Sequence, residues 1–311
     1  MQNHPTDHAH SHPHAHSNAR SYSNERARLW ASIAVTGLGF ILELVGGLMT
    51  NSLALLGDAG HMLTHFMALG ISLMANIFAT MPSTKQKTFG FYRLEILAAL
   101  ANGAFLVLVT GWIFVETFRR IINPPPIATS PMLVIAVIGL AANLVSAALL
   151  AGAGQGDLNI RSAVFHLAAD TLSSVAVIGG GFLLMATGWL WVDPVLGFAI
   201  GILIVFPAGK LIKESIDILL EAVPSHLDVS EVARSIATVP GVREAHDIHI
   251  WSLTSGLYSM SAHVTTDDIR SSESQPILAA IEKLLNQKFR IGHLTIQFEC
   301  VACSGPTESG I

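Results

Sequence analysis

The sequence predicts an all-α transmembrane bundle of six helices, followed by a small two-layer α+β domain with the element order αββαβ. Charged residues make up only 13% of the 311 residues, whereas a soluble domain typically carries about 25%. The deficit is concentrated between about residues 29 and 219. Six apolar stretches in that region each approach the ~20 residues that a membrane span requires. The C-terminal part of the chain after this region has an ordinary composition, which predicts a soluble part after the membrane part.

The first 28 residues are polar and of low complexity, and we expect a disordered cytoplasmic tail there. The tail holds a run of histidines: His4, His8, His10, His12, His14 and His16. Such a tract cannot form a core and is typical of metal binding. The alternative is an expression tag, although tags are rarely interrupted by Ala, Ser and Pro. No cleavable signal peptide is visible, because this stretch lacks an apolar segment.

The six apolar stretches are predicted to be membrane helices at residues 29–50, 53–80, 94–118, 131–153, 160–186 and 192–213. Pro, Gly and Asn residues punctuate the gaps, as in Asn123-Pro124-Pro125-Pro126. A soluble bundle would need a polar stripe along each outward-facing helix, and these segments have almost none. We therefore expect a transmembrane domain at 29–215, with membrane lipid around it.

Basic residues set the predicted orientation. With the N-terminus inside, the cytoplasmic ends of the spans carry Arg20, Arg26, Arg28, Lys85, Lys87, Arg93, Arg161, Lys210 and Lys213. The positive-inside rule then places both termini in the cytoplasm. Arg119 and Arg120 fall on the opposite side, and we expect them to snorkel to the lipid headgroups.

Residues 216–300 change character and predict the soluble domain. A helix is expected at 229–239, strands at 242–251 and 257–265, a second helix at about 275–289 and a last strand at 294–299. This order suggests a small two-layer domain. Residues 301–311 are expected to form a C-terminal tail.

Ionisable groups within the second and fifth spans predict a metal site. An ionisable side chain inside a bilayer is costly, so each one is a functional hypothesis. His61 and His65 are four residues apart, as are His166 and Asp170. Each pair therefore points to one side of its helix, and two facing helices would supply four ligands. Nitrogen and oxygen ligands in a tetrahedron suit Zn²⁺.

Other polar residues at membrane depth have two interpretations. Asp58 lies one turn before His61, where it accepts the second ring N–H of that histidine and fixes its tautomer. Alternatively, Asp58 caps the helix after Asn51-Ser52. Further polar residues at this depth are Glu43, Glu95, Asn102 and Asn143, for which interhelical hydrogen bonding is the favoured interpretation.

Several motifs resemble the cation diffusion facilitator family of the zinc, cobalt and cadmium exporter type. The motifs are Asn51-Ser52-Leu53-Ala54-Leu55-Leu56-Gly57-Asp58-Ala59-Gly60-His61-Met62, Phe89-Gly90-Phe91-Tyr92-Arg93-Leu94-Glu95-Ile96-Leu97, the HxxxD from His166 to Asp170, and His246-Asp247-Ile248-His249-Ile250-Trp251. The resemblance covers nearly the whole chain beyond the tail. It implies a homodimeric, proton-coupled metal exporter with six spans and a ferredoxin-like cytoplasmic domain, located in the bacterial inner membrane.

One position departs from the zinc branch of that family. The second-span motif there is usually HxxxD, whereas this chain has His61-x-x-x-His65. A second histidine resembles members associated with cobalt or nickel. Imidazole suits zinc, cobalt and nickel alike, so the residues leave the preferred metal open among Zn²⁺, Co²⁺, Ni²⁺ and Cd²⁺.

The resemblance also implies metal sites in the cytoplasmic domain. His246, His263 and Glu299 align with ligands of the family's cytoplasmic site. Cys300 and Cys303, the two cysteines of the chain, resemble a further site that N-terminal histidines complete. From the residues alone, this Cys-x-x-Cys pair reads as metal ligands or as a redox pair. His249 is expected to be a core or interface residue.

The favoured function is export of Zn²⁺ or a similar dication in exchange for protons. Only neutral imidazole binds metal, so protons compete for the site. A membrane-anchored metal sensor or buffer is the alternative, but an anchor has no reason to keep an intramembrane quartet. No enzyme activity and no prosthetic group are expected, and no HExxH motif supplies a protease base. The mild net charge of -5 suggests no nucleic-acid partner.

Overall fold

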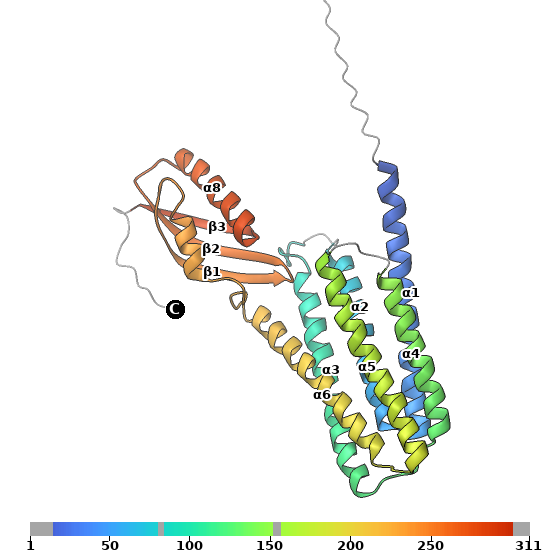
Figure 1. The fold of residues 1–311 in the computed structure, drawn as a ribbon. Coiled ribbons are helices and arrows are strands. Elements are labelled where there is room, and N and C mark those ends of the chain that lie inside the picture. Colours follow the sequence, from blue (N-terminus) through green and yellow to red (C-terminus); the bar gives the residue numbers. More distant parts are fainter. Residues whose placement is uncertain (1–14, 80–83, 152–156, 301–311) are drawn as a thin grey trace, which may run out of the picture. The chain divides into compact units, whose positions relative to one another are not determined.

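The structure is a computed structural model that describes residues 15–79, 84–151 and 157–300 (Figure 1). Side chains are not described for residues 15–29, 65, 68–69, 72–79, 150–151 and 157–170 within those ranges. The chain divides into two compact units. One is Met1–Gly70 with Leu106–Phe206, and the other is Ile71–Phe105 with Pro207–Ile311.

Each predicted span corresponds to one helix. The helices are α1 (Ala15–Thr50), α2 (Leu53–Ala79), α3 (Tyr92–Ile122), α4 (Thr129–Ala151), α5 (Asp157–Thr187) and α6 (Val192–Leu219). The main difference is at the start of α1, which begins at Ala15 and so extends into the predicted tail. Residues 15–28 contain Ala, Arg and Glu but no Pro, and these are favourable residues for a helix.

Apolar side chains cover much of the outer surface of the helices. Large side chains such as Leu108, Phe118 and Phe206 are exposed, which water would disfavour and lipid would accept. Where side chains are described, four helical segments are long and apolar enough to cross a membrane: Trp30–Thr50, Tyr92–Ile122, Thr129–Leu149 and Val192–Leu219. The chain is therefore a multi-pass membrane protein, and the number of six spans stays a prediction.

A polar network holds together the start of α2 and the start of α6. Asp193 accepts hydrogen bonds from the Leu53 N–H (2.7 Å) and the Ala54 N–H (3.1 Å), and the Ser52 hydroxyl also donates to it. The Ser52 oxygen accepts from the Leu55 N–H (3.1 Å). Ser52 and Asp193 together therefore cap α2, because they satisfy backbone donors that the helix leaves open.

The prediction that Arg120 snorkels to the headgroups was wrong. Its side chain is buried and donates to the Asn51 carbonyl (2.6 Å) and to Glu116 (3.0 Å). A buried guanidinium needs such partners because its donors are desolvated. The neighbouring Arg119 is exposed and 3.7 Å from Glu116, so snorkelling stays a prediction for that residue.

The soluble domain has the predicted element order. It comprises α7 (Val229–Ile236), β1 (Val242–Thr254), β2 (Leu257–Thr266), α8 (Ser271–Phe289) and β3 (Ile291–Cys300). The sheet order is β1-β2-β3, with β1 antiparallel and β3 parallel to β2. Both helices pack on one sheet face around a core that includes Ile236, Met260, Val264, Ile281 and Leu285. The result is a two-layer α+β domain, as the sequence predicts.

Candidate functional site

Asp58 links α2 to α5 within the first of the two compact units. Its side chain is fully buried. The Ser173 hydroxyl donates to Asp58 Oδ1 (2.7 Å) and the Ser174 hydroxyl donates to Asp58 Oδ2 (2.9 Å). Hydrogen bonds to an ionised carboxylate are stronger than neutral ones, so the two serines stabilise the negative charge of this buried group.

The two helices run in opposite directions through this contact. Asp193, just after the turn from α5 to α6, bonds to Leu53 and Ala54 at the start of α2. The end of α5 and the start of α2 are therefore at the same end of the unit. His61 lies three residues after Asp58 in α2, and so further from that end of the unit.

Asp170 of α5 lies at a similar distance from the contact, but it comes before the two serines in the chain, because α5 is antiparallel to α2. Asp170 precedes Ser173 by three residues and Ser174 by four. Each residue of a helix advances about 1.5 Å along the axis. The backbone positions of His61 and Asp170 are therefore each about one turn from the Asp58–serine contact, on the same side of it.

The predicted transport ligands are described to different degrees. His61 lies in α2 and is partly buried. His65 lies one turn further along α2, and His166 and Asp170 lie in α5. The side chains of these three residues fall outside the described part of the structure. Their joint role as ligands therefore stays a prediction.

The helix-capping interpretation of Asp58 does not fit the structure. The helix begins at Leu53, so Asp58 lies more than a turn inside it. Ser52 and Asp193 form the cap instead. The supporting role of Asp58 beside His61 stays a prediction. The partners of Asp58, Ser173 and Ser174, were missed at the sequence level, although their spacing of three and four residues from Asp170 was a usable signal.

The four other polar residues at membrane depth behave differently from one another. Asn143 donates from α4 to Ser174 of α5 (3.3 Å), which confirms interhelical bonding. Glu95 instead accepts from the Thr254 hydroxyl of β1. For Glu43 the prediction was wrong, because both of its carboxylate oxygens are buried without a hydrogen-bond partner among the described residues. The Asn102 side-chain oxygen is likewise buried and unpartnered there.

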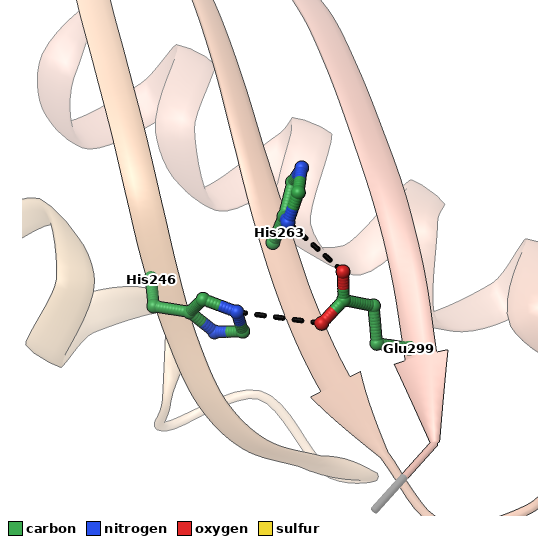
Figure 2. A group of neighbouring side chains, drawn as sticks. All are labelled: His246, His263 and Glu299. Atoms are coloured by element: carbon green, nitrogen blue, oxygen red, sulfur yellow. Dashed lines mark ion pairs between the residues drawn. The ribbon is translucent and has the colours of Figure 1, made fainter. Parts of the chain in front are cut away.

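A second cluster lies on the sheet of the soluble domain (Figure 2). His246 of β1 is directly paired with His263 of β2, and Glu299 comes from β3. The Glu299 carboxylate oxygens lie 3.4 Å from His246 Nε2 and 2.9 Å from His263 Nδ1. One ligand atom from each residue can be chosen so that all lie within 4.8 Å of one another. The structure thus brings together the three predicted cytoplasmic ligands.

The geometry of this cluster suits a divalent metal ion. Ligand atoms at about 2.0–2.1 Å from a tetrahedral Zn²⁺ lie about 3.3 Å apart, close to the two distances found here. The side chains of His246, His263 and Glu299 are 30%, 33% and 21% exposed, which leaves access for an ion. The ring nitrogen of His246 nearest to Glu299 is Nε2, and the other ring nitrogen, Nδ1, is buried without a partner among the described residues. Two imidazoles and one carboxylate leave a fourth position open.

A β-bulge turns His246 toward the other two ligands. The pairing steps from His246–His263 to His249–Ser261, so three residues of β1 match two of β2. Asp247, the extra residue, has a φ of 47°, a left-handed conformation that Asp tolerates better than most residues. Without the extra residue, strict alternation would place His246 on the same face as the buried Ile250.

The histidine beyond the bulge does not lie in the core. The side chain of His249 is 59% exposed, and its Nε2 is 3.1 Å from Asp247 Oδ1. The core alternative for His249 was therefore wrong, and the interface alternative stays a prediction. Asp247 also lies 3.8 Å from His263 Nε2. Sequence reasoning missed Asp247, because a bulge cannot be located from alternation alone.

The cysteine pair is only partly described. Cys300 is the last residue of β3 and is disulfide-bonded, and Cys303 lies outside the described residues. A metal-binding cysteine is a thiolate, so the metal-ligand interpretation applies to the reduced form and stays a prediction. The histidines at positions 4 to 14 also lie outside the described residues, and the side chain of His16 is not described.

Comparisons with known proteins cover nearly the whole chain. Residues 29–220 match the family described as the cation efflux transmembrane domain, and residues 224–301 match the cation efflux protein, cytoplasmic domain. The chain is 42% identical over 296 residues to the metal cation efflux system protein CzcD of Cupriavidus metallidurans. The aligned residues make up 95% of this chain and 90% of that protein.

Two further relatives are similar over comparable lengths. The cadmium, cobalt and zinc/H⁺-K⁺ antiporter of Bacillus subtilis is 43% identical over 283 residues, covering 90% of each chain. The zinc transporter ZitB of Escherichia coli is 38% identical over 300 residues, covering 96% of this chain and 95% of that protein. A solved metal-bound C-terminal domain of the CzcD transporter is 44% identical, covers 24% of this chain and 99% of that one, and has a TM-score of 0.22.

Proposed function

The chain belongs to the cation efflux family, also called the cation diffusion facilitators, and on this premise we propose that it exports Zn²⁺ and related dications from the cytoplasm in exchange for protons. It is a metal cation efflux transporter and not an enzyme. The cargo follows from the relatives, whose names cover zinc, cobalt and cadmium. The Bacillus subtilis relative is named as an antiporter of H⁺ and K⁺, which supports ion exchange as the driving reaction.

The transport site in this proposal consists of His61, His65, His166 and Asp170. The observation that carries it is the pair of hydrogen bonds from Ser173 and Ser174 to Asp58. This contact ties α2 to α5 about one turn away from both His61 and Asp170. Because the helices are antiparallel there, His65 and His166 each follow one turn further on. Four ligands at two levels on neighbouring helices can surround one ion.

Protons and metal compete for these ligands. Imidazole binds a metal only in its neutral form, and its reference pKa of about 6.5 allows exchange near physiological pH. A proton-rich outer face would protonate the histidines and release the metal. In that orientation the proton gradient drives export.

The second histidine on α2 bears on selectivity. His65 replaces the aspartate that is usual in the zinc branch, so the quartet has one carboxylate and three imidazoles. Imidazole accepts zinc, cobalt and nickel alike. We therefore propose that the transporter accepts several dications. Its substrates would be nickel together with zinc, cobalt and cadmium, which the relatives' names include.

The cluster of His246, His263 and Glu299 is proposed to bind a regulatory metal ion. The short distances between its ligand atoms and the open fourth position support this role. The domain's family assignment supports a cytoplasmic location. We also propose a homodimer with both termini in the cytoplasm, six membrane spans and a ferredoxin-like cytoplasmic domain. The tail histidines would collect metal ions for the transport site.

The alternative function is a membrane-anchored metal sensor or buffer. The buried polar contact between Asp58 and the two serines argues against it, because a mere anchor has no use for a charged group at that depth. The test is metal accumulation in inverted membrane vesicles with an imposed proton gradient, run with zinc, cobalt, nickel and cadmium in parallel. Export predicts accumulation that collapses when the gradient is removed. Binding that is unaffected by the gradient would instead favour the sensor.

A further inference from the structure

Glu43 carries a buried carboxyl group that the transport site does not use. It lies in α1, its side chain is 0% exposed, and both carboxylate oxygens lack a hydrogen-bond partner among the described residues. An ionised carboxylate without a partner is strongly disfavoured in such surroundings, and a group so placed binds a proton instead.

The position of Glu43 is set by close packing against α4. A Cβ atom added at Gly139 would lie 1.7 Å from Glu43 Oε1, so the carboxyl group occupies the space that a side chain would fill. Asn143 lies one turn further along α4, and it donates to Ser174. Ser174 in turn donates to Asp58. Glu43 is therefore next to the polar contact that joins α2 and α5.

Asp58 on α2 is the other carboxyl group beside this polar contact, which Asn143 and Ser174 extend from α4 to α5. The residues of α4 and α5 in this contact, Asn143, Ser173 and Ser174, do not titrate. Two neighbouring carboxyl groups do not readily ionise together. Asp58 has two hydroxyl donors for its charge, whereas Glu43 has none among the described residues. These surroundings favour the charge on Asp58 and the proton on Glu43.

We propose that Glu43 is a proton-binding site of the transporter, which loses its proton when a dication binds between α2 and α5 and regains one when the dication leaves. This inference rests on the proposed function. The positive charge of the ion offsets the repulsion from Asp58 and favours the ionised form of Glu43. The released proton enters the cytoplasm. When the ion departs on the outer side, a proton from that side binds to Glu43. Each cycle thus moves one metal ion outward and this proton inward.

The first test counts protons released on metal binding. Zinc is added to the full-length protein in detergent, in weakly buffered solution with a pH indicator. The variant Glu43→Gln keeps the size of the side chain but cannot ionise. We expect it to bind zinc and, at saturating zinc, to release about one proton fewer per protein chain than the wild type. The matched control is Glu214→Gln, an exposed carboxylate, which should release as many protons as the wild type. An unchanged proton count in Glu43→Gln would overturn the proposal.

The second test begins with the wild-type protein alone. Infrared difference spectra of the wild type, recorded with and without zinc, should lose the carbonyl stretch of a protonated carboxyl group. Glu43→Gln should lack that band and assigns it. A wild-type spectrum without such a loss would overturn the proposal. Vesicle transport separates the two hypotheses: absence of metal accumulation by the wild type would contradict the proposed function, whatever the infrared result for Glu43.

Discussion

The hydroxyl of Ser174 donates a 2.9 Å hydrogen bond to the buried carboxylate of Asp58 and thereby connects α5 to α2. Ser173 supplies a second donor at 2.7 Å. This pair of bonds sets the two proposed halves of the transport site at the same depth, since His61 and Asp170 each lie about one turn away.

The first prediction tests that connection. Replacing both Ser173 and Ser174 by Ala leaves the Asp58 carboxylate with two donors fewer, at a cost of about 1–3 kcal/mol. We expect lower thermal stability in detergent and also a raised KM for zinc in vesicles, because the site loses its alignment. The control is Ser146→Ala, which removes a buried hydroxyl bonded to Ser32 and Thr36 between α1 and α4. It should lower stability and leave the KM unchanged. A normal KM in the double variant would contradict the alignment role.

The second prediction concerns the tail. Deleting residues 1–19 removes weak histidine ligands but no residue of the proposed transport site. We expect slower export at low metal concentration and nearly unchanged transport at saturating metal, as measured in inverted vesicles. The control is the full-length chain with its six tail histidines replaced by Gln. Complete loss of transport at saturating metal would show that the tail is part of the transport mechanism itself.

The third prediction concerns selectivity. The variant His65→Asp restores the second carboxylate of the usual zinc quartet and shortens the ligand. A site with two carboxylates fully neutralises a dication. It also has one imidazole ligand fewer, and imidazole is a ligand that suits cobalt and nickel. We expect the wild type to transport several metals and the variant to prefer zinc. Competition between zinc and cobalt or nickel in vesicles measures this. An unchanged preference would mean that His65 does not face the metal.

The fourth prediction concerns the cytoplasmic cluster. Replacing His263 by Ala removes the residue that lies 2.9 Å from Glu299. We expect the full-length protein to bind one metal ion fewer per chain in calorimetric titration, since two remaining ligands hold zinc poorly. His293→Ala, a histidine outside the cluster that stacks edge-on with Phe89, serves as the control. Equal binding stoichiometry in both variants would exclude the cluster as a metal site.

The membrane helices were predictable because the bilayer imposes one strong rule. Every backbone polar group within it must bond internally, so long apolar stretches become helices. The helix starts were less predictable. Nothing in the hydropathy between residues 15 and 28 marks a helix, yet α1 begins at Ala15. The αββαβ order of the soluble domain also followed from pattern, because alternation and helical periodicity depend on local residues alone.

The details of the sites were less predictable, because they depend on contacts between elements. The hydrogen bonds of Asp58 join residues 115 and 116 positions apart, and those of Asp193 cap a helix that begins 140 positions earlier. The bulge at Asp247 reverses the face on which His246 lies, and alternation alone cannot locate it. The resemblance to a known family supplied His246, His263 and Glu299 as ligands, and the structure brings those three together.

In the proposed mechanism, protons drive metal export through a site that includes Asp170. The most direct test is zinc accumulation in inverted vesicles under an imposed proton gradient, for the wild type and for Asp170→Ala. Asp170 is the one carboxylate of the quartet, and its loss leaves a dication without a compensating charge in a low-dielectric site. The control is Asp267→Ala, which replaces an exposed carboxylate paired with Arg243 outside the membrane helices. We expect near-total loss of transport in Asp170→Ala, with normal amounts of the protein in the membrane, and wild-type transport in Asp267→Ala. Transport by Asp170→Ala above about half of the wild-type rate would contradict a transport site that includes Asp170.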